Sequence, residues 1–179
     1  MPPGQPLPRP ATTADLGSVQ AIYAHHVLNG LGSFEEAPPA QEEMRRRFDE
    51  IAGRGLPYLA LELDGVLAGY GYCAPYRARS AYRYTLEDSV YVRPDMFGRG
   101  VGRAILGELI AQCAELGYRE LVAVIGDSAN AASIALHASH GFVRAGTLRS
   151  VGFKFGRWVD SVIMQRPLGE GDATRPINR

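Results

Sequence analysis

The chain has 179 residues, 46% of them hydrophobic, which is enough for one globular domain with a buried core. Its 19 lysines and arginines balance 19 aspartates and glutamates, so no net charge favours nucleic acid or an anionic membrane as a partner. Cys73 and Cys113 form neither a C-x-x-C pair nor a zinc-ligand spacing, so we expect reduced thiols, a cytoplasmic protein and no metal. No segment approaches the roughly 20 apolar residues that cross a bilayer, and we expect no export signal.

The first half of the chain is predicted to form two helices and a hairpin. Residues 1–7 are rich in proline, and we expect them to be flexible. Apolar residues at helical spacing predict helices over 16–29 and 41–52. Strands over 58–63 and 66–73 flank Asp64-Gly65, a pair that suits the positive φ angles of a tight turn. These two strands should therefore be antiparallel.

The second half alternates strands with helices. A polar loop leads to a strand over 85–92, and a glycine-rich turn then opens an amphipathic helix that runs from Val101 to Leu116. The remaining expected elements are a strand, a short helix and two strands, over 120–125, 130–139, 142–148 and 158–164. An early hairpin followed by strand–helix–strand predicts an α/β fold with one mixed sheet flanked by helices. The domain should span 8–168, with a flexible polar tail over 169–179.

The glycine-rich turn has the features of a phosphate-binding site. Its sequence is Phe97-Gly98-Arg99-Gly100-Val101-Gly102-Arg103, placed after a strand and at the start of a helix. Free backbone N–H groups and the helix dipole favour an anion there, and the two arginines add positive charge. The dinucleotide motif G-x-G-x-x-G fails because Arg103 replaces its third glycine, and the Walker motif fails for lack of Gly-Lys-Ser/Thr. A glycine-rich helix start with surface arginines is the alternative interpretation.

This turn resembles the signature Q/R-x-x-G-x-G/A of the GNAT superfamily of acetyltransferases, which bind acetyl-CoA. Phe97 departs from the signature, because the family has glutamine or arginine at that position. The resemblance implies a central twisted sheet in which two strands splay apart to form the CoA cleft. It also implies that the strand edge at Val90, Tyr91 and Val92 pairs with pantetheine, and that Asn130 and Ser133 line the same cofactor.

The resemblance extends over about residues 8–167 and narrows to one branch of the superfamily. The stretches RARSAYRYTLEDSVYVRP, VAVIGDSANAASIALHASHGF and VGFKFGRWVD are similar to the phosphinothricin and methionine-sulfoximine acetyltransferases. Those enzymes acetylate the α-amino group of amino-acid analogues. The resemblance therefore implies a small amine as acceptor, a role in detoxification, and a homodimer.

Two residues are candidates for the chemistry. Strand alternation places Glu87 on the face opposite Asp88, and the resemblance assigns Glu87 as the general base, acting through water. A solvated strand glutamate is the alternative. His137 stands where many relatives have a tyrosine that faces the CoA sulfur, so it is expected to donate a proton to the thiolate or to relay the amine proton. A buried histidine that serves only the core is the alternative.

The loop before the strand of Glu87 is the candidate acceptor site. Arginines there suit bidentate capture of a carboxylate, phosphinate or sulfonyl oxygen. By resemblance Arg79 and Tyr82 match substrate-contacting positions best and Arg77 less closely, while Phe34 lines the other side. A solvated basic loop is the alternative interpretation.

Other functions remain possible from the sequence. A polyamine, an aminoglycoside or a protein N-terminus could replace the amino-acid analogue, although such cationic or extended acceptors would favour an acidic groove over this basic loop. A CoA-binding sensor without catalysis is a further alternative, favoured slightly by Phe97 and opposed by the presence of Glu87 and His137.

Overall fold

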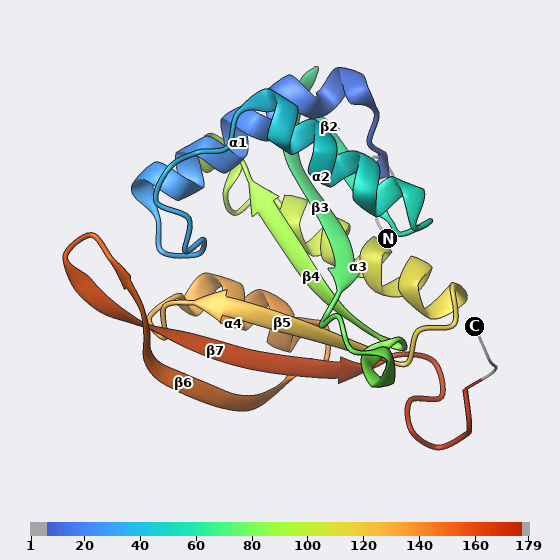
Figure 1. The fold of residues 1–179 in the computed structure, drawn as a ribbon. Helices are drawn as coiled ribbons and strands as arrows, with labels where there is room; N and C mark the ends of the chain where they lie inside the picture. The colour runs from blue at the N-terminus through green and yellow to red at the C-terminus, as the bar shows by residue number, and fades with distance from the viewer. Residues whose placement is uncertain (1–6, 177–179) are drawn as a thin grey trace.

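The computed structural model describes residues 7–176 and contains a single seven-stranded sheet between two layers of helices (Figure 1). The strand order is β1-β2-β3-β4-β5-β7-β6, and every neighbouring pair is antiparallel except β4–β5. The strands are β1 (Arg9–Pro10), β2 (Tyr58–Leu63), β3 (Val66–Pro75), β4 (Thr85–Val92), β5 (Glu120–Gly126), β6 (Val143–Lys154) and β7 (Arg157–Pro167).

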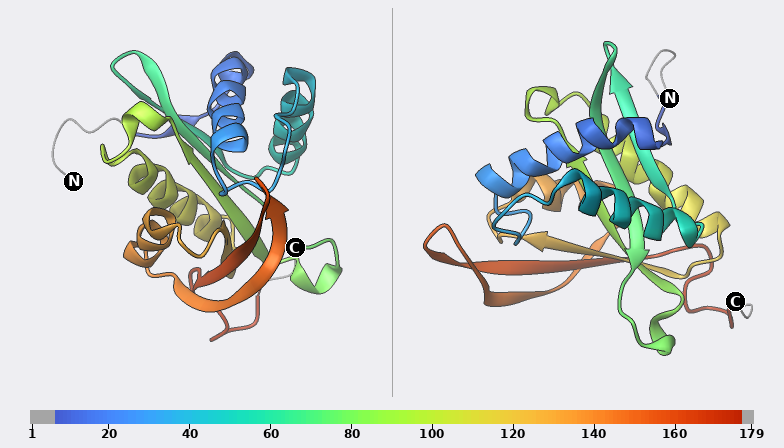
Figure 2. Two further views of the ribbon diagram at one scale, coloured as in Figure 1. Left: turned by 90° about the vertical axis from the view of Figure 1, so that its left-hand side faces the viewer. Right: turned by 45° about the horizontal axis from the view of Figure 1, so that its top comes forward.

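Two helices cover each face of the sheet, as Figure 2 shows from two further directions. The first pair, α1 (Leu16–Asn29) and α2 (Gln41–Gly53), packs on one face, and α3 (Val101–Glu115) and α4 (Ala131–Ser139) pack on the other. Short 3-10 turns, η1 (Thr13–Asp15), η2 (Ser80–Tyr82) and η3 (Pro94–Met96), connect the elements. Within residues 7–176, no helix is both long and apolar enough to span a bilayer.

Close packing of α3 on the sheet depends on two glycines of β3. A Cβ atom at Gly69 would lie 2.7 Å from Val101 Cγ1, and one at Gly71 would lie 2.6 Å from Ile105 Cγ2. These contacts are too short for a side chain, so the glycines allow the helix to sit directly on the strand. On the opposite face, the ring of Tyr70 stacks on that of Tyr91, with centroids 5.2 Å apart. The core therefore lies on both sides of β3 and β4.

The predicted mixed sheet with flanking helices is confirmed, as are the Asp64-Gly65 hairpin and both early helices. The last two strands are longer than predicted, because register shifts at Arg144/Gly146 and Leu148/Gly152 interrupt the alternation that marks a strand in sequence. The pairing of β1 with β2 was not predicted, since only two residues form it and one is a proline. Residues 1–6 and 177–179 lie outside the described part of the chain, and the expected flexible ends remain predictions.

Candidate active site

A gap opens between the two parallel strands at the centre of the sheet. The β4–β5 pairing runs only from Thr85 opposite Glu120 to Asp88 opposite Ala123, while β4 continues to Val92 and β5 to Gly126. Beyond Asp88 the strands part, as Figure 1 shows. Backbone groups on the facing edges are left without a strand partner there, which is the condition for binding an extended chain between them.

The peptide groups of β4 point alternately toward β3 and toward this gap. The N–H of Arg93 donates to the carbonyl of Ala68 on β3 at 2.8 Å, so the alternation turns the peptides of Val90 and Val92 toward the gap and that of Tyr91 toward β3. Of the three residues expected to pair with pantetheine, two therefore face the gap with their backbone. His26 Nε2 lies 2.8 Å from the carbonyl oxygen of Val92 and engages it from α1.

The glycine-rich turn lies at the open end of this gap and leads into α3. Gly98 and Gly100 have φ angles of 74° and 82°, a left-handed conformation that favours glycine. Gly100 caps α3, and the first N–H groups of a helix lack intrahelical partners. The turn therefore presents backbone donors at a positive helix end, as the sequence predicted for an anion site.

The side chains of the turn differ in what they offer. A Cβ at Gly102 would lie 3.2 Å from Leu136 Cδ2, so this glycine serves the packing of α3 on α4. Arg99 Nη2 pairs with Asp64 Oδ2 at 2.9 Å, which directs part of its charge to the β2–β3 turn, whereas Arg103 is exposed. Phe97 is 60% exposed, with its ring centroid 6.3 Å from that of His26. Its apolar ring thus covers His26 and holds no hydrogen-bonding group near the turn.

Glu87 lies on the face of β4 that α1 and α2 cover, one residue before the paired section ends at Asp88. Side chains alternate along a strand, so Glu87 and Tyr91 point to the same face of β4. The Tyr91 ring contacts that of Tyr23 on α1, with centroids 5.1 Å apart, so this is the face that α1 covers. Burial raises the pKa of Glu87 to about 7, with the neighbouring charge of Asp88 adding to the rise and Arg77 opposing it. A carboxylate with a pKa near neutrality can accept and return a proton at physiological pH.

His137 lies on the other face of β4, where it is bonded to Asp88. Its Nδ1 donates to the carbonyl of Ser133 at 2.7 Å, and its Nε2 lies 2.9 Å from Asp88 Oδ2. Both side chains are buried, and Asp88 Oδ1 has no hydrogen-bond partner among the described residues. Burial of the imidazole lowers the pKa of His137, but the hydrogen bond and charge of Asp88 outweigh this and raise it.

The geometry therefore separates the two catalytic candidates. Glu87 projects from one face of β4, whereas His137 of α4 lies against the other face, and both ring nitrogens of His137 are already engaged. Asp88 was not a sequence candidate, although the strand alternation placed this charged residue on the buried face with Leu86. A carboxylate on the buried side of a strand is a signal for a paired or functional group.

The predicted acceptor residues lie at the two opposite ends of the parallel strands. The loop with Arg77, Arg79 and Tyr82 precedes the start of β4, and a cavity of about 540 Å³ lies between this loop and α2. The guanidinium of Arg77 stands 5.0 Å from the ring centroid of Tyr76, and the Tyr82 ring lies 5.6 Å from that of Tyr76. Phe34 instead contacts the region of Gly126, at the far end of β5.

Asn130 and Ser133 lie at the start of α4, beside the end of β5. Asn130 Oδ1 accepts from the backbone N–H of Ser133 at 3.2 Å and so caps the helix. Ser133 in turn provides the carbonyl that fixes the His137 ring. Asn130 Nδ2 also donates to the carbonyl of Gly126 at 3.5 Å, which joins the start of α4 to the end of β5.

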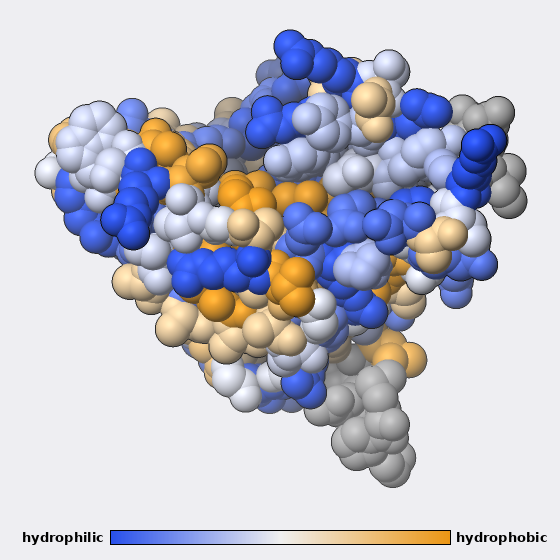
Figure 3. Space-filling view, turned by 90° about the horizontal axis from the view of Figure 1, so that it is seen from below, coloured by the Kyte–Doolittle hydropathy of each residue, from blue (hydrophilic) through white to orange (hydrophobic). Residues whose placement is uncertain are grey.

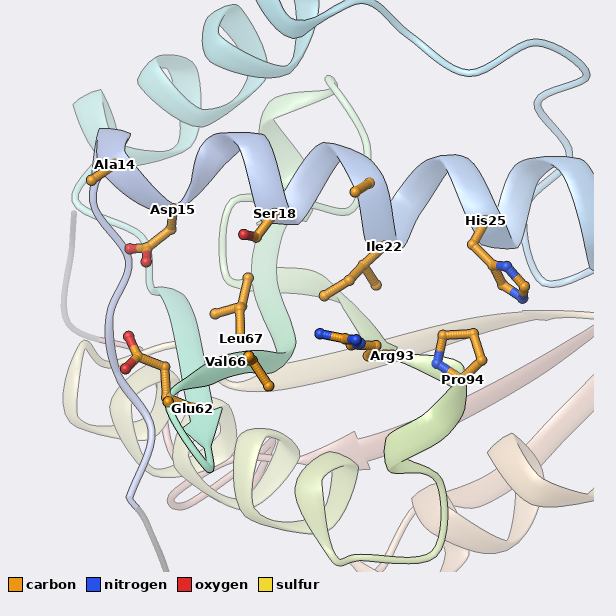
Figure 4. Close-up of a pocket in the computed structure, with 12 residues that line it drawn as sticks. Ala14, Asp15, Ser18, Ile22, His25, Glu62, Val66, Leu67, Arg93 and Pro94 are labelled. Carbon is orange, nitrogen blue, oxygen red and sulfur yellow. The ribbon is translucent and has the colours of Figure 1, made fainter.

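A separate groove of about 530 Å³ lies between α1 and the β2–β3 hairpin (Figure 4). Asp15 and Glu62 stand at one end, His25 and Pro94 stand at the other, and Arg93 lies between them beneath Ile22. The acidic end is neutralised by Arg9, which bonds both carboxylates. The groove contains none of the candidate site residues, so it lies apart from the gap and from Glu87.

Comparisons with known proteins agree with this geometry. Residues 9–163 match the family model described as acetyltransferase (GNAT) domain. The chain is 59% identical over 162 residues to a phosphinothricin N-acetyltransferase of Alcaligenes faecalis, covering 90% of this chain and 82% of that protein. It is 40% identical over 168 residues to an L-methionine sulfoximine/L-methionine sulfone acetyltransferase of Pseudomonas aeruginosa, covering 93% and 95%.

A solved structure extends the likeness to the fold. The GNAT phosphinothricin acetyltransferase of Sinorhizobium meliloti, crystallised with acetyl-CoA, superposes with a TM-score of 0.94 at 46% identity, covering 97% of this chain and 94% of that one. The chain belongs to the GNAT acetyltransferases. Its gap between β4 and β5, with the peptides of Val90 and Val92 turned inward and the turn at Gly98 and Gly100 at its open end, fits a molecule that joins an extended amide chain to a pyrophosphate.

Proposed function

We propose that this GNAT enzyme transfers the acetyl group of acetyl-CoA to the α-amino group of small amino-acid analogues of the phosphinothricin, methionine sulfoximine and methionine sulfone type. The observation that carries the proposal is Glu87, a half-buried carboxylate with a pKa of about 7, one residue before the last pair of β4 with β5. The names of the relatives support this substrate class. A role in detoxification follows from it.

Each group around the gap has a role in this proposal. The turn from Phe97 to Arg103 and the peptides of Val90 and Val92 hold the cofactor, together with Asn130 and Ser133. Acetyl-CoA supplies a thioester whose carbonyl carbon accepts the amine. Glu87 removes the proton from the arriving ammonium group through a water molecule, since amines near neutral pH are mostly charged. The proton held between Asp88 and His137 is the source that we assign to the departing thiolate.

The acceptor is held by the residues that flank Glu87. Arg77, Arg79 and Tyr82 supply donors for a carboxylate or phosphinate oxygen. Phe34 limits the size of the acceptor side chain from the other end. Such a basic, partly closed site favours a small anionic amino acid over a polycation.

An acceptor screen tests the proposal. Thiol release from acetyl-CoA is measured with phosphinothricin, methionine sulfoximine and methionine sulfone, and with a polyamine, an aminoglycoside and a peptide N-terminus as competing classes. We expect turnover with the first three. Turnover with only the polyamine, the aminoglycoside or the peptide would mean that the enzyme acts on that class of amine and not on amino-acid analogues. Tight acetyl-CoA binding in calorimetry without turnover of any amine would indicate a CoA-binding sensor.

We also infer a cytoplasmic homodimer that contacts neither nucleic acid nor membrane. The balanced charge and the two buried, free thiols support the location and the choice of partners. The dimer is supported by an apolar surface on β6 and β7, named here the hairpin patch, whose members are each more than half exposed: Leu148, Val151, Phe153, Phe155 and Trp158. Figure 3 shows apolar side chains gathered on the lower face, which carries these strands. Monomeric proteins rarely expose so many large apolar groups together.

A further inference from the structure

Lys154, near the end of β6, is a buried lysine whose ammonium group serves a distant loop. The residue is 2% exposed, and its Nζ donates to the carbonyl of Gly30 at 2.9 Å and to that of Ser33 at 2.7 Å. Within residues 7–176, no carboxylate lies within ion-pair distance of it. Burying an ammonium group is costly, so its position needs a compensating role.

The loop that Lys154 binds joins α1 to α2 and carries Phe34. It packs into a slot on the face of the sheet that Gly126 of β5 and Gly152 of β6 keep open, on either side of β7. A Cβ at Gly126 would lie 2.1 Å from the carbonyl oxygen of Leu31, and one at Gly152 would lie 2.5 Å from Phe34 Cε2. The loop backbone and the Phe34 ring therefore occupy the space that side chains at these two positions would take.

The far side of the loop is also fixed. Ser33 Oγ lies 2.9 Å from the hydroxyl of Tyr23, and that hydroxyl donates to Glu35 Oε1 at 3.0 Å. Arg47 donates to the same carboxylate oxygen at 2.6 Å. Lys154 is the one contact of this set that comes from the β6–β7 hairpin, so it ties the loop to the strand on which Phe34 rests.

We infer that Lys154 is a positioning residue that holds Phe34 at the acceptor site and so sets the affinity of the enzyme for its amine substrate without touching it. The inference rests on the proposed function, in which Phe34 lines the acceptor site. Acetyl-CoA is proposed to bind in the β4–β5 gap and at the glycine-rich turn, and Lys154, on β6, belongs to neither. Releasing the loop should therefore raise the KM for the amine and leave the affinity for acetyl-CoA nearly unchanged.

The test replaces Lys154 by methionine, which keeps the length of the side chain and removes its charge and donors. We expect kcat/KM for the acceptor to fall about tenfold to a hundredfold through a higher KM, because small displacements of a positioning group have effects of that size. The affinity for acetyl-CoA should change less than about twofold. Arg149→Met, which removes an exposed cation from the same strand, is the matched control and should leave both constants unchanged.

A second substitution reaches the same loop by another route. Gly152→Ala should press on the Phe34 ring and raise the acceptor KM in the same selective way, which keeps the inference testable if Lys154→Met does not fold. The double variant Phe34→Ala/Lys154→Met should be no worse than Phe34→Ala alone, because both changes act through one ring. Additive losses, equal effects on both substrates, or an unchanged acceptor KM would overturn the inference.

Hydrogen exchange separates this inference from the proposed function. In Lys154→Met the amides of residues 30–35 should exchange faster than in the wild type, whatever the substrate. If wild-type enzyme turns over no amino-acid analogue but the loop is released in the variant, the proposed acceptor is wrong and the positioning contact stands. Unchanged exchange together with normal turnover would show that Lys154 does not hold the loop.

Discussion

At the scale of single residues, the proposed mechanism depends on Glu87, whose position on β4 leaves its side chain half-buried. Its raised pKa means that the carboxylate, which is the active form of a base, is lost as the pH falls below about 7. Acetyl transfer by the wild type should therefore rise with pH through about 7 and then level off.

Replacing Glu87 by glutamine keeps the shape of the side chain but removes its capacity to accept a proton. We expect the acetyl-transfer step to slow by about 10²–10⁴, with acetyl-CoA affinity nearly constant. Higher pH should restore much of the rate, since more of the acceptor amine is then neutral. Single-turnover kinetics over a pH series measure this. Full turnover by Glu87→Gln at neutral pH would remove Glu87 from the mechanism.

The Asp88–His137 pair makes a separate prediction for stability. The folded-state pKa of His137 is raised above its ordinary value of 6.5, so the pair contributes stability that is fully present below pH 6.5 and is lost as the pH rises through the raised value. Asp88→Asn can bond a neutral imidazole but cannot balance a charged one.

The difference in the free energy of unfolding between wild type and Asp88→Asn should therefore increase as the pH falls from about 8.5 to about 5.5. At the acid end it should approach about 3–5 kcal/mol, the range for breaking a buried pair. Denaturant unfolding at several pH values measures this difference, and NMR titration of His137 should show a lower pKa in the variant. A difference in the free energy of unfolding that is the same at every pH would mean that the proton of this pair does not contribute to stability.

At the scale of elements, the helices and the hairpin follow from local sequence, and the site only in part. Helix periodicity and the Asp64-Gly65 turn act over a few residues, so they are visible without the fold. The contact of Lys154 with Ser33 spans 121 positions, and that of Asp88 with His137 spans 49. Such contacts exist only once the sheet order is fixed, which no local pattern specifies.

The glycine-rich turn shows the same limit. The sequence predicted one role for all three glycines, whereas the structure gives Gly98 and Gly100 a backbone role and Gly102 a packing role against Leu136. Positive φ and helix packing both select glycine, so composition cannot separate them. Substitutions can separate the two roles, because loss of the backbone role should weaken acetyl-CoA binding, whereas loss of the packing role should also lower thermal stability.

Gly100→Val should weaken acetyl-CoA binding by at least about tenfold with a modest effect on stability, because a β-branched residue strains the left-handed turn. Gly102→Val should lower the melting temperature as well, since its side chain meets Leu136. Calorimetry and thermal unfolding measure the two effects. Gly53→Ala, in open space at the end of α2, is the control. Unchanged acetyl-CoA affinity in Gly100→Val would remove the turn from the cofactor site.

At the scale of the whole molecule, the long β6–β7 hairpin has two sides with different tasks. Its inner side contacts the α1–α2 loop through Gly152 and Lys154, and its outer side carries the hairpin patch. A second copy that covers the patch would brace the strand on which Phe34 rests. Dimerisation and acceptor binding would then be coupled through one element.

The dimer can be tested at the centre of the hairpin patch. Trp158 is 64% exposed, and its ring lies 5.3 Å from that of Phe153, so an aspartate at position 158 would place a charge within the apolar contact. Sedimentation equilibrium should give the wild type about twice the 19.4 kDa of one chain, and Trp158→Asp a mass near one chain. Leu28→Asp, which changes an apolar residue on α1 that is 56% exposed, should stay dimeric. Because the hairpin holds the α1–α2 loop that carries Phe34, the Trp158→Asp monomer should also show a raised KM for the amine with little change for acetyl-CoA. A wild-type mass of one chain at micromolar concentration would mean that the hairpin patch is not a dimer contact.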